Sequence, residues 1–553
     1  MEKRVILAIV LSFLVMVLYQ MIFMKPKPQA ESPVQVGTPA QAVESSPALP
    51  PAAAEAQPEV RQEEVPAVEA PLPEEARAES ERQVVVESSL YRAVWSNRGA
   101  SLRSWKLKEH LDEGGEGLEL VSRRAGEVGR YPFFLDTQEA ELDRTANNGL
   151  FIPSMSQISL DDGETGELKF YYSDGKNVRI EKIFVFIGGT YHFDVLINVW
   201  KDGRKVEPRI IWGPGIGNPV LTSKRQQFGA GSGVAILAAD KVYRINERKY
   251  KPESNAFNFA SWAAYEDNYM TALFITAPQQ GTALFLKEVR DEAAADYYLS
   301  VSAPRKAFMG PKEFDRLRAF GHESKKLINF GFFGAIAEIL LISIKAIHKA
   351  VPNWGFAIII LTFLIKIVFF PLTYSSTKSM AKMQELQPKI KALRARYKKA
   401  KQDINQRRQM NEEMMKLYKE HGINPAGGCL PILIQIPVFW GFFRMLVVAV
   451  EFRHSPFILW IKDLSVHDPY YVTPILMGAT QFISQKMTPT SADPSQAKMM
   501  LIMPVVMTIF FMNFQSGLVL YWLTNNVLQI GQQCIMNRMM AKKKRESHGK
   551  RKK

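Results

Sequence analysis

The stretch IIILTFLIKIVFFPLTY, residues 358–374, is long and apolar enough to enter a membrane, and it carries one lysine, Lys366, near its middle. At 1.5 Å per residue, the water at either end of such a helix lies roughly 12 Å from this lysine along the axis. A lysine at this depth costs about 2.5–3.5 kcal/mol, so its side chain must face protein or water. The stretch therefore predicts a membrane span with a polar face.

Small and polar side chains share that face, because Gly355, Thr362, Lys366 and Thr373 recur at helical spacing. In a later apolar segment Gln435 lies between two prolines. Polar stripes can simply join helices by hydrogen bonds. However, no Asp or Glu lies deep in any span to pair with Lys366, which favours a water-containing cavity facing the charge. The last span carries its own stripe, formed by Trp522, Asn525, Asn526, Gln529, Gln532 and Gln533.

Apolar segments recur along the chain. Residues 5–24 are uncharged, follow Lys3 and Arg4 and precede no small-residue cleavage site, so they predict an uncleaved anchor with a cytoplasmic N-terminus. The anchor, the segment around Lys366 and four later segments make six predicted spans. The fourth and fifth spans are short enough to require tilt or a thinned bilayer. The later segments are residues 430–450, 470–485, 501–514 and 518–536.

The region between the anchor and Lys366 contains two segments that differ in composition and in the pattern of apolar residues. Residues 25–83 are rich in Pro, Ala and Glu and nearly devoid of aromatic residues, a composition that predicts a disordered linker. Residues 84–322 show short alternating runs such as VRIEKIFVF (residues 178–186), which predict a large antiparallel β-sandwich domain. Dipeptides that suit tight hairpin turns separate these runs, namely Asp174-Gly175, Gly188-Gly189 and Asp202-Gly203.

The net charge of +15 is concentrated in two places. Thirteen Lys or Arg against five Asp or Glu lie in residues 378–420, which predict a helical hairpin with a break near residues 398–403. Nine against one lie in residues 538–553. If the N-terminus is cytoplasmic, both basic segments are cytoplasmic and the β domain is outside, in agreement with the positive-inside rule. Residues 327–349 predict an amphipathic helix in the membrane interface, with packing on the β domain as the alternative.

Four quoted runs resemble the membrane region of the YidC/Oxa/Alb family of membrane protein insertases. The anchor, the linker and the external β domain resemble its Gram-negative form, in which the β domain is a supersandwich and the membrane core has five helices. The runs are GFAIIILTFLIKIVFFPLTYSSTKSMAKMQELQPKI (residues 355–390), INPAGGCLPILIQIPVFWGFF (423–443), FILWIKDLSVHDPYYVTPILMGATQFISQKMTP (457–489) and SGLVLYW (516–522).

The resemblance implies a hydrophilic, positively charged groove that receives the polar part of a nascent membrane protein. Carried over by motif, the groove residues are Lys366, Thr362, Gln435, Trp522 and Asn525. The family commonly has arginine at the position of Lys366. Lysine keeps the positive charge but loses the forked donor geometry, so electrostatic attraction is expected here rather than a bidentate grip.

The resemblance also implies partners: nascent membrane proteins, the ribosome, the Sec translocon and anionic lipids. The basic tail and the hairpin are expected to contact ribosomal RNA or lipid, although the tail can also serve only as a topology signal. Methionines of the hairpin, such as Met383, Met414 and Met415, can offer an adaptable apolar surface or fill the hairpin's own interface. The expected contacts of the tail are Lys542, Lys543, Lys544, Arg545, Lys550 and Arg551.

The predicted organisation places an inner-membrane protein of a Gram-negative cell with both termini in the cytoplasm and the β domain in the periplasm. Its segments are an anchor (1–24), a linker (25–83), the β domain (84–322), an interfacial helix (323–350), a second span (351–374), a cytoplasmic hairpin (375–428), a third span (429–450), a periplasmic loop (451–468), a fourth span (469–487), a cytoplasmic loop (488–499), a fifth span (500–515), a sixth span (516–537) and a basic tail (538–553).

Two other classes of function compete with an insertase. A transporter or channel would use Lys366 as an anion or substrate site, but it predicts inverted repeats and paired ionisable groups, which the sequence lacks. A carbohydrate-active β domain on a membrane anchor would need an acid/base pair, and none stands out. The sequence has no GxxxxGK[ST] loop and no buried carboxylate pair, so it suggests neither ATP hydrolysis nor a proton relay. We expect no enzyme activity, no cofactor and no metal.

Overall fold

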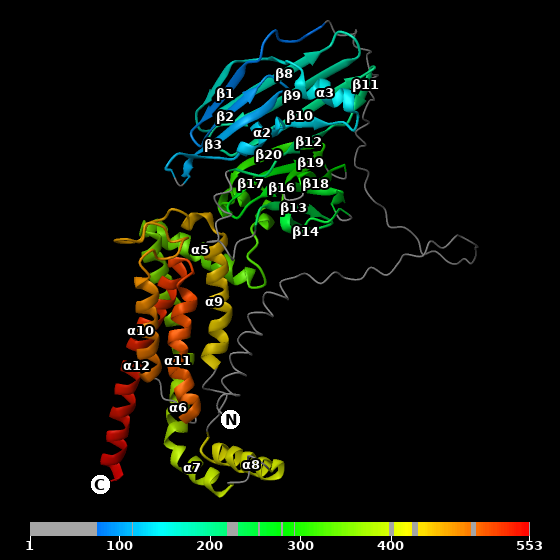
Figure 1. Ribbon diagram of the computed structural model, residues 1–553. Coiled ribbons are helices and arrows are strands. Elements are labelled where there is room, and N and C mark those ends of the chain that lie inside the picture. Colours follow the sequence, from blue (N-terminus) through cyan, green and yellow to red (C-terminus); the bar gives the residue numbers. More distant parts are fainter. Residues whose placement is uncertain are drawn as a thin grey trace, which may run out of the picture.

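The structure is a computed structural model that describes residues 75–551 apart from residues 113, 218–230, 253–254, 278–279, 292–293, 398–402, 423–429 and 488–493. It has a β-rich N-terminal part and a helical C-terminal part, which lie one above the other in Figure 1. The predicted anchor and nearly all of the predicted linker lie outside the described residues.

Three sheets build the β domain (Figure 1). The largest has ten strands, in the order β14-β13-β16-β17-β20-β10-β9-β8-β6 with β11 paired to β10; the others are β4-β3-β2-β1-β7 and β15-β18-β19-β12-β5. Among the described strands, neighbours pair antiparallel except for β1 and β7. The strands are β1 (Gln83–Ser88), β2 (Tyr91–Ser96), β3 (Ser101–Leu111), β4 (Gly117–Glu119), β5 (Phe134–Asp136), β6 (Ile152–Pro153), β7 (Gln157–Leu160), β8 (Thr165–Ser173), β9 (Val178–Ile187), β10 (His192–Lys201), β11 (Arg204–Val206), β12 (Arg209–Trp212), β13 (Gly233–Ala238), β14 (Lys241–Asn246), β15 (Ala256–Asn258), β16 (Ala260–Glu266), β17 (Met270–Thr276), β18 (Thr282–Asp291), β19 (Ala294–Ser302) and β20 (Pro304–Pro311).

The predicted hairpins of this domain are confirmed. Strand β9 buries every second side chain, as period-two alternation requires when one face of a strand is covered. The turn residues Gly175, Gly189 and Gly203 all have positive φ, which suits glycine, and Asp202 beside Gly203 does as well. The aromatic core joins the sheets, because the ring of Trp95 in β2 lies 4.2 Å from that of Phe184 in β9.

Seven long helices, α5, α6 and α8 to α12, and the shorter helix α7 follow the β domain in the described part of the chain. Helix α5 packs along α9, and α12 packs against α6 and α10. In Figure 1, α6 and α9 to α12 run side by side away from the β domain, while α8 lies at the far end of α6. The described helices are α2 (Arg123–Val128), α3 (Ala140–Asn148), α4 (Phe314–Phe320), α5 (Gly334–Ala350), α6 (Trp354–Glu385), α7 (Gln387–Arg396), α8 (Ile404–Glu420), α9 (Leu430–Val448), α10 (Val472–Met487), α11 (Pro494–Phe511) and α12 (Ser516–Arg551), with 3₁₀ turns η2 (Glu247–Lys249), η4 (Ser324–Leu327) and η6 (Val450–Phe452).

Several helix bounds differ from those expected. Helix α5 begins at Gly334 instead of residue 327, after a turn at Gly331 with φ +74°. Helix α6 continues through Pro371 to Glu385, beyond residue 374, where the second span was predicted to end. By length and hydropathy, α6 alone among the described helices passes as a membrane span, and the apolar helical segments Ile434–Val448 and Leu501–Phe511 are shorter.

The predicted hairpin is formed by α7 and α8. Asp403 caps α8, its side chain accepting from the backbone N–H of Asn405 at 2.8 Å, and Gly422 follows the helix with φ +59°. Met383 and Met414 pack against Leu386 and Ile390 inside the hairpin. Other hairpin side chains are free of such packing: Met415 is 48% exposed.

The β domain and the helices meet at a partly buried ionic joint. Lys345 of α5 lies 2.8 Å from Asp315 Oδ2 of α4 and 2.9 Å from Glu451 Oε1 of η6. Burial raises the pKa of the Glu451 carboxyl, and the ammonium of Lys345 offsets part of that rise. Nearby, Asn268 Nδ2 in the β16–β17 turn donates to the carbonyl of Val447 at the end of α9, at 3.0 Å. The joint thus connects α4, α5 and the loop after α9.

Candidate functional site

Lys366 of α6 points at α12. Its Nζ donates to Gln529 Oε1 at 2.9 Å, and among the described residues this neutral amide is the partner of the ammonium. On other sides of α6 the apolar side chains are exposed, including Ile367 at 54% and Val368 at 72%. The amide of Gln529 positions the charge of Lys366 without neutralising it. The same helix carries this charge on one side and an exposed apolar surface on the others.

Thr362 lies one turn before Lys366 and is 1% exposed. Its Oγ1 donates to the carbonyl of Ile358 at 2.6 Å, the usual back-bonding of a helical threonine. The hydroxyl group therefore has its hydrogen-bond acceptor within α6.

The other expected groove residues lie on α9 and α12. Gln435 Nε2 donates to Tyr521 OH at 2.8 Å, which joins these two helices. The indole Nε1 of Trp522 donates to Gln481 Oε1 of α10 at 3.3 Å. The sequence reasoning did not single out Tyr521 or Gln481, although Gln481 is a polar residue inside an apolar segment and could have been found on that ground.

The stripe on α12 divides into buried and half-buried members. Asn526 is 3% exposed and donates through Nδ2 to the carbonyl of Met477 at 3.1 Å, so it fastens α12 to α10. The expected groove residue Asn525 is half-buried beside it. The structure thus brings Lys366 and Gln529 together, while Gln435 and Trp522 each contact a separate neighbour.

Three side-chain amide atoms in these helices are buried without a protein partner among the described residues. They are Gln485 Oε1, Gln532 Nε2 and Gln533 Oε1. Buried polar atoms are nearly always hydrogen-bonded, to protein or to water. The amides at this end of α10 and α12 therefore need partners that the described protein atoms do not supply.

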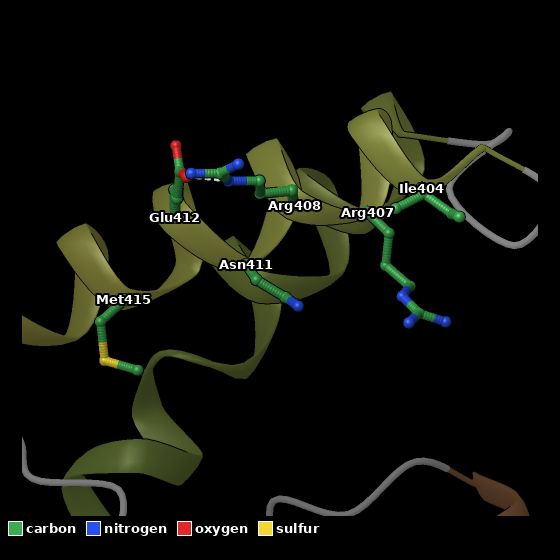
Figure 2. A pocket seen from close by; sticks show the side chains of 6 residues that line it. All are labelled: Ile404, Arg407, Arg408, Asn411, Glu412 and Met415. Carbon is green, nitrogen blue, oxygen red and sulfur yellow. Dashed lines mark hydrogen bonds and ion pairs between the residues drawn. The ribbon is translucent and has the colours of Figure 1, made fainter.

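The outer face of α8 gathers exposed basic and apolar side chains (Figure 2). An open hollow there is lined by Ile404, Arg407, Arg408, Asn411, Glu412 and Met415. Arg408 Nε lies 3.1 Å from Glu412 Oε1, whereas Arg407 projects away from that pair in Figure 2. Ile404 is 77% exposed. This face combines positive charge with apolar surface at the end of α6 remote from the β domain.

The predicted contacts of the tail lie within α12, which extends to Arg551, but the side chains of Lys542, Lys543, Lys544, Arg545, Lys550 and Arg551 lie outside the described part of the structure. In the described ranges, no three His, Cys, Asp or Glu side chains are arranged to hold a metal ion.

Comparison with known proteins gives two family matches. The family described as the 60Kd inner membrane protein matches residues 346–544, and the YidC periplasmic domain matches residues 83–343. The membrane protein insertase YidC of Geobacter metallireducens is 37% identical over 566 residues, covering 98% of this chain and 99% of that protein. That of Syntrophus aciditrophicus is 37% identical over 569 residues, covering 97% of this chain and all of that protein.

Among solved structures, the crystal structure of an active YidC insertase with its first transmembrane domain resolved covers 83% of this chain and 94% of its own, at 19% identity and a TM-score of 0.35. A likeness of that size adds no argument. The sequence relatives match this chain over nearly their whole length. The periplasmic-domain match covers the β domain and runs into α5, and the other family match covers the end of α5 and the later helices. The chain therefore belongs to the YidC family of membrane protein insertases.

Proposed function

We propose that this chain inserts proteins into the inner membrane and helps them fold, with Lys366 as the positive residue of a hydrophilic groove. One observation carries the proposal: the ammonium of Lys366, deep in an apolar helix, is held by the neutral amide of Gln529 at 2.9 Å. An intramembrane charge that is positioned but not neutralised is expected to act on something that is not part of the chain.

The charge supplies an attraction for acidic segments. At about 8 Å and an effective dielectric of about 20, one ammonium attracts one carboxylate by about 2 kcal/mol. A substrate span of about twenty apolar residues gains roughly 6–12 kcal/mol on insertion, so its entry needs no external energy source. The obstacle is the polar flank that must cross hydrocarbon. A positive groove shortens that crossing.

The buried amide side chains of α10 and α12 support the presence of water in the groove. Gln485, Gln532 and Gln533 each bury a polar atom with no partner among the described protein atoms. Water satisfies such atoms where a cavity is polar and roomy enough. Thr362, Gln435, Trp522 and Asn525 belong to the groove wall in this proposal: Gln435 and Trp522 hold α9, α10 and α12 together around it.

The proposed topology has six spans, with α6, α9, α10, α11 and α12 as the five-helix core and residues 1–24 as the anchor. Both termini lie in the cytoplasm and the β domain in the periplasm, because the basic hairpin and tail then obey the positive-inside rule. Helix α5 lies in the interface on the periplasmic side of the inner membrane. Its exposed Ile339 and Ile342 support that placement, at 64% and 46%.

The proposed partners are nascent membrane proteins, the ribosome, the Sec translocon and anionic lipids. The exposed face of α8 supports contact of the hairpin with RNA or an anionic surface, because it presents Arg407 next to apolar Ile404 and Met415 (Figure 2). The basic tail offers a second contact of the same charge.

The test is insertion of a two-span substrate with an acidic translocated loop into vesicles that contain this chain. We expect Lys366→Leu and Lys366→Glu to lose insertion and Lys366→Arg to keep it, because a positive charge is what the groove supplies. Full insertion by all three variants would show that Lys366 is tolerated and not used. Lys349→Leu, which removes an exposed lysine of α5, is the matched control.

A further inference from the structure

Two arginines clamp the short segment that leads from the β domain into α5. Arg244 of β14 donates through Nη2 to the carbonyls of Lys326, at 2.7 Å, and Leu327, at 2.9 Å. Arg444 of α9 donates through Nη2 to the carbonyl of Asn329. Guanidinium groups from two elements distant in sequence therefore meet over four residues of backbone.

Both guanidinium groups keep unused donors. In the described part of the chain, neither Nη1 has a hydrogen-bond partner, and neither is among the buried atoms that lack one. The Nε of Arg444 has no acceptor, and the Nε of Arg244 lies 3.5 Å from Glu266 Oε1. Glu266 already pairs with Lys312 at 3.0 Å. Arg244 and Lys312 thus share this one carboxylate, and no carboxylate among the described residues pairs with Arg444, which leaves the arginine pair with an excess of positive charge.

The surroundings place this excess charge next to an apolar surface. Arg444 lies one helical turn before the end of α9 at Val448. Gly331, with φ +74°, brings the backbone against Arg444, because a methyl group there would lie 3.4 Å from Nε. The next residue, Phe332, is 95% exposed. Aromatic and arginine side chains at one level are typical of the headgroup region of a bilayer.

We propose that Arg244 and Arg444 bind the phosphate of a phospholipid, with Phe332 against its acyl chains. The forked donors of arginine match phosphate oxygens in a bidentate manner. The site rests on the proposed placement of α5 in the interface. It lies at the β-domain end of the helices, opposite to the basic hairpin and tail, so its lipid belongs to the other leaflet.

The experiment counts lipid molecules retained by the purified full chain in detergent, by native mass spectrometry during titration with phosphatidylglycerol. We expect the double variant Arg244→Gln/Arg444→Gln to retain one lipid fewer than the wild type, and each single variant to bind that lipid about tenfold more weakly, because each loses a charge-assisted hydrogen bond. Arg204→Gln, at an exposed position of β11, is the matched control and should bind as the wild type does.

Two further variants make the result decisive. Arg444→Gln also removes the bond to Asn329, so Arg444→Lys, which keeps the charge without the fork, must weaken binding at an unchanged unfolding temperature. Phe332→Ser must weaken lipid binding as well. Equal retention by wild type and double variant would overturn the proposal, and so would displacement of the lipid by millimolar inorganic phosphate, which would indicate a site for the free anion. Insertion is not the readout, so this outcome is independent of the groove.

Discussion

At the scale of single residues, the contact between Lys366 and Gln529 sets the charge of the proposed groove. Gln529→Glu keeps the length of the side chain and turns a neutral acceptor into a carboxylate at about the same 2.9 Å. We expect insertion of a substrate with an acidic loop to fall about tenfold, because the ion pair neutralises an attraction of that order. The measurement is the vesicle insertion rate for substrates with acidic and neutral loops.

Gln532→Glu, on the same helix, is the control for a new carboxylate near the groove. A loss for the neutral loop as large as that for the acidic loop in Gln529→Glu would contradict this reading, because damage to folding affects both substrates while lost attraction affects only the acidic one.

A second lysine shows the opposite treatment of a buried charge. Lys182 of β9 is fully buried and donates to the carbonyls of Gly99 at 2.6 Å and Phe133 at 2.8 Å. Burial lowers the pKa of Lys182 to about 7. In the unfolded chain this pKa is about 10.4. Between these values the unfolded state binds more protons than the folded state, so the free energy of unfolding must rise with pH.

We therefore expect the β domain to gain up to about 1.4 kcal/mol of unfolding free energy per pH unit above pH 7 from this one group. The measurement is chemical unfolding of the domain at pH 7, 8 and 9. Lys182→Met should remove the slope, and Lys176→Met, at an exposed turn, should leave it. A flat profile in the wild type would mean that the backbone carbonyls keep Lys182 protonated.

The two lysines also show what sequence can predict at this scale. Lys366 is found because one charge in an apolar run of membrane length is costly wherever the helix goes. Its partner Gln529 lies 163 residues away, and which amide of a polar stripe meets it depends on how α12 rotates against α6. Lys182 lies between Ile180 and Phe184 on the buried face of an alternating strand. Its burial was not predicted, because lysine is almost always exposed unless a partner satisfies it.

At the scale of elements, a close contact fixes the spacing of two helices. A methyl group on Gly478 of α10 would lie 1.9 Å from Thr508 Oγ1 of α11. We expect Gly478→Ala to force these helices apart and cost about 1–3 kcal/mol, the usual range for overpacking. The measurement is thermal unfolding in detergent followed by circular dichroism at 222 nm.

Gly531 of α12 supplies the control, because nothing lies within 4 Å of a methyl group there. Gly531→Ala should be neutral or stabilising, since alanine is the better helix former. Adding Thr508→Ala to Gly478→Ala should recover part of the loss. No recovery would show that the two helices are not held at this point.

Helix bounds were the weaker part of the prediction at this scale. Pro371 and the polar run after it suggest an end to the span, but a proline inside a helix can be accommodated, and α6 continues to Glu385. The start of α5 was misplaced for a different reason. Residues 327–333 are mostly apolar like the helix, but the chain turns at Gly331 before α5 begins, and Arg244 and Arg444 bond the backbone carbonyls that precede this turn.

At the scale of the whole molecule, the joint at Lys345 connects the β domain to the helices. Lys345→Met leaves the carboxyl of Glu451 buried without its cation, with 9% of that side chain exposed. Removing one partner of a buried pair costs about 3–5 kcal/mol. We expect a lower unfolding temperature for Lys345→Met, measured on the full chain in detergent.

Lys345→Met/Glu451→Leu should recover most of this loss, because the stranded carboxyl is gone. Lys349→Met, at an exposed position of the same helix, should change nothing. If the double variant were as unstable as the single one, the joint would act through packing and not through charge.

The division into a β domain and a helical part could be predicted from the pattern of apolar residues, since alternating runs with turn dipeptides give way to long apolar runs. The pairing of three sheets could not, because strand order depends on contacts between distant residues: β1 pairs in parallel with β7, and β12 pairs with both β19 and β5. The ionic joint is equally remote in sequence, linking Asp315, Lys345 and Glu451.

The uninterrupted course of α6 has a mechanical consequence. Its 32 residues make a rod of about 48 Å, longer than the roughly 30 Å of a hydrocarbon core, so in the proposed topology about a third of the rod projects beyond the bilayer. The projecting end carries the hairpin, and the embedded part carries Lys366, with Pro371 between them as a point of bending. A force that a bound partner exerts on the hairpin is therefore transmitted along this one helix to the ammonium of Lys366.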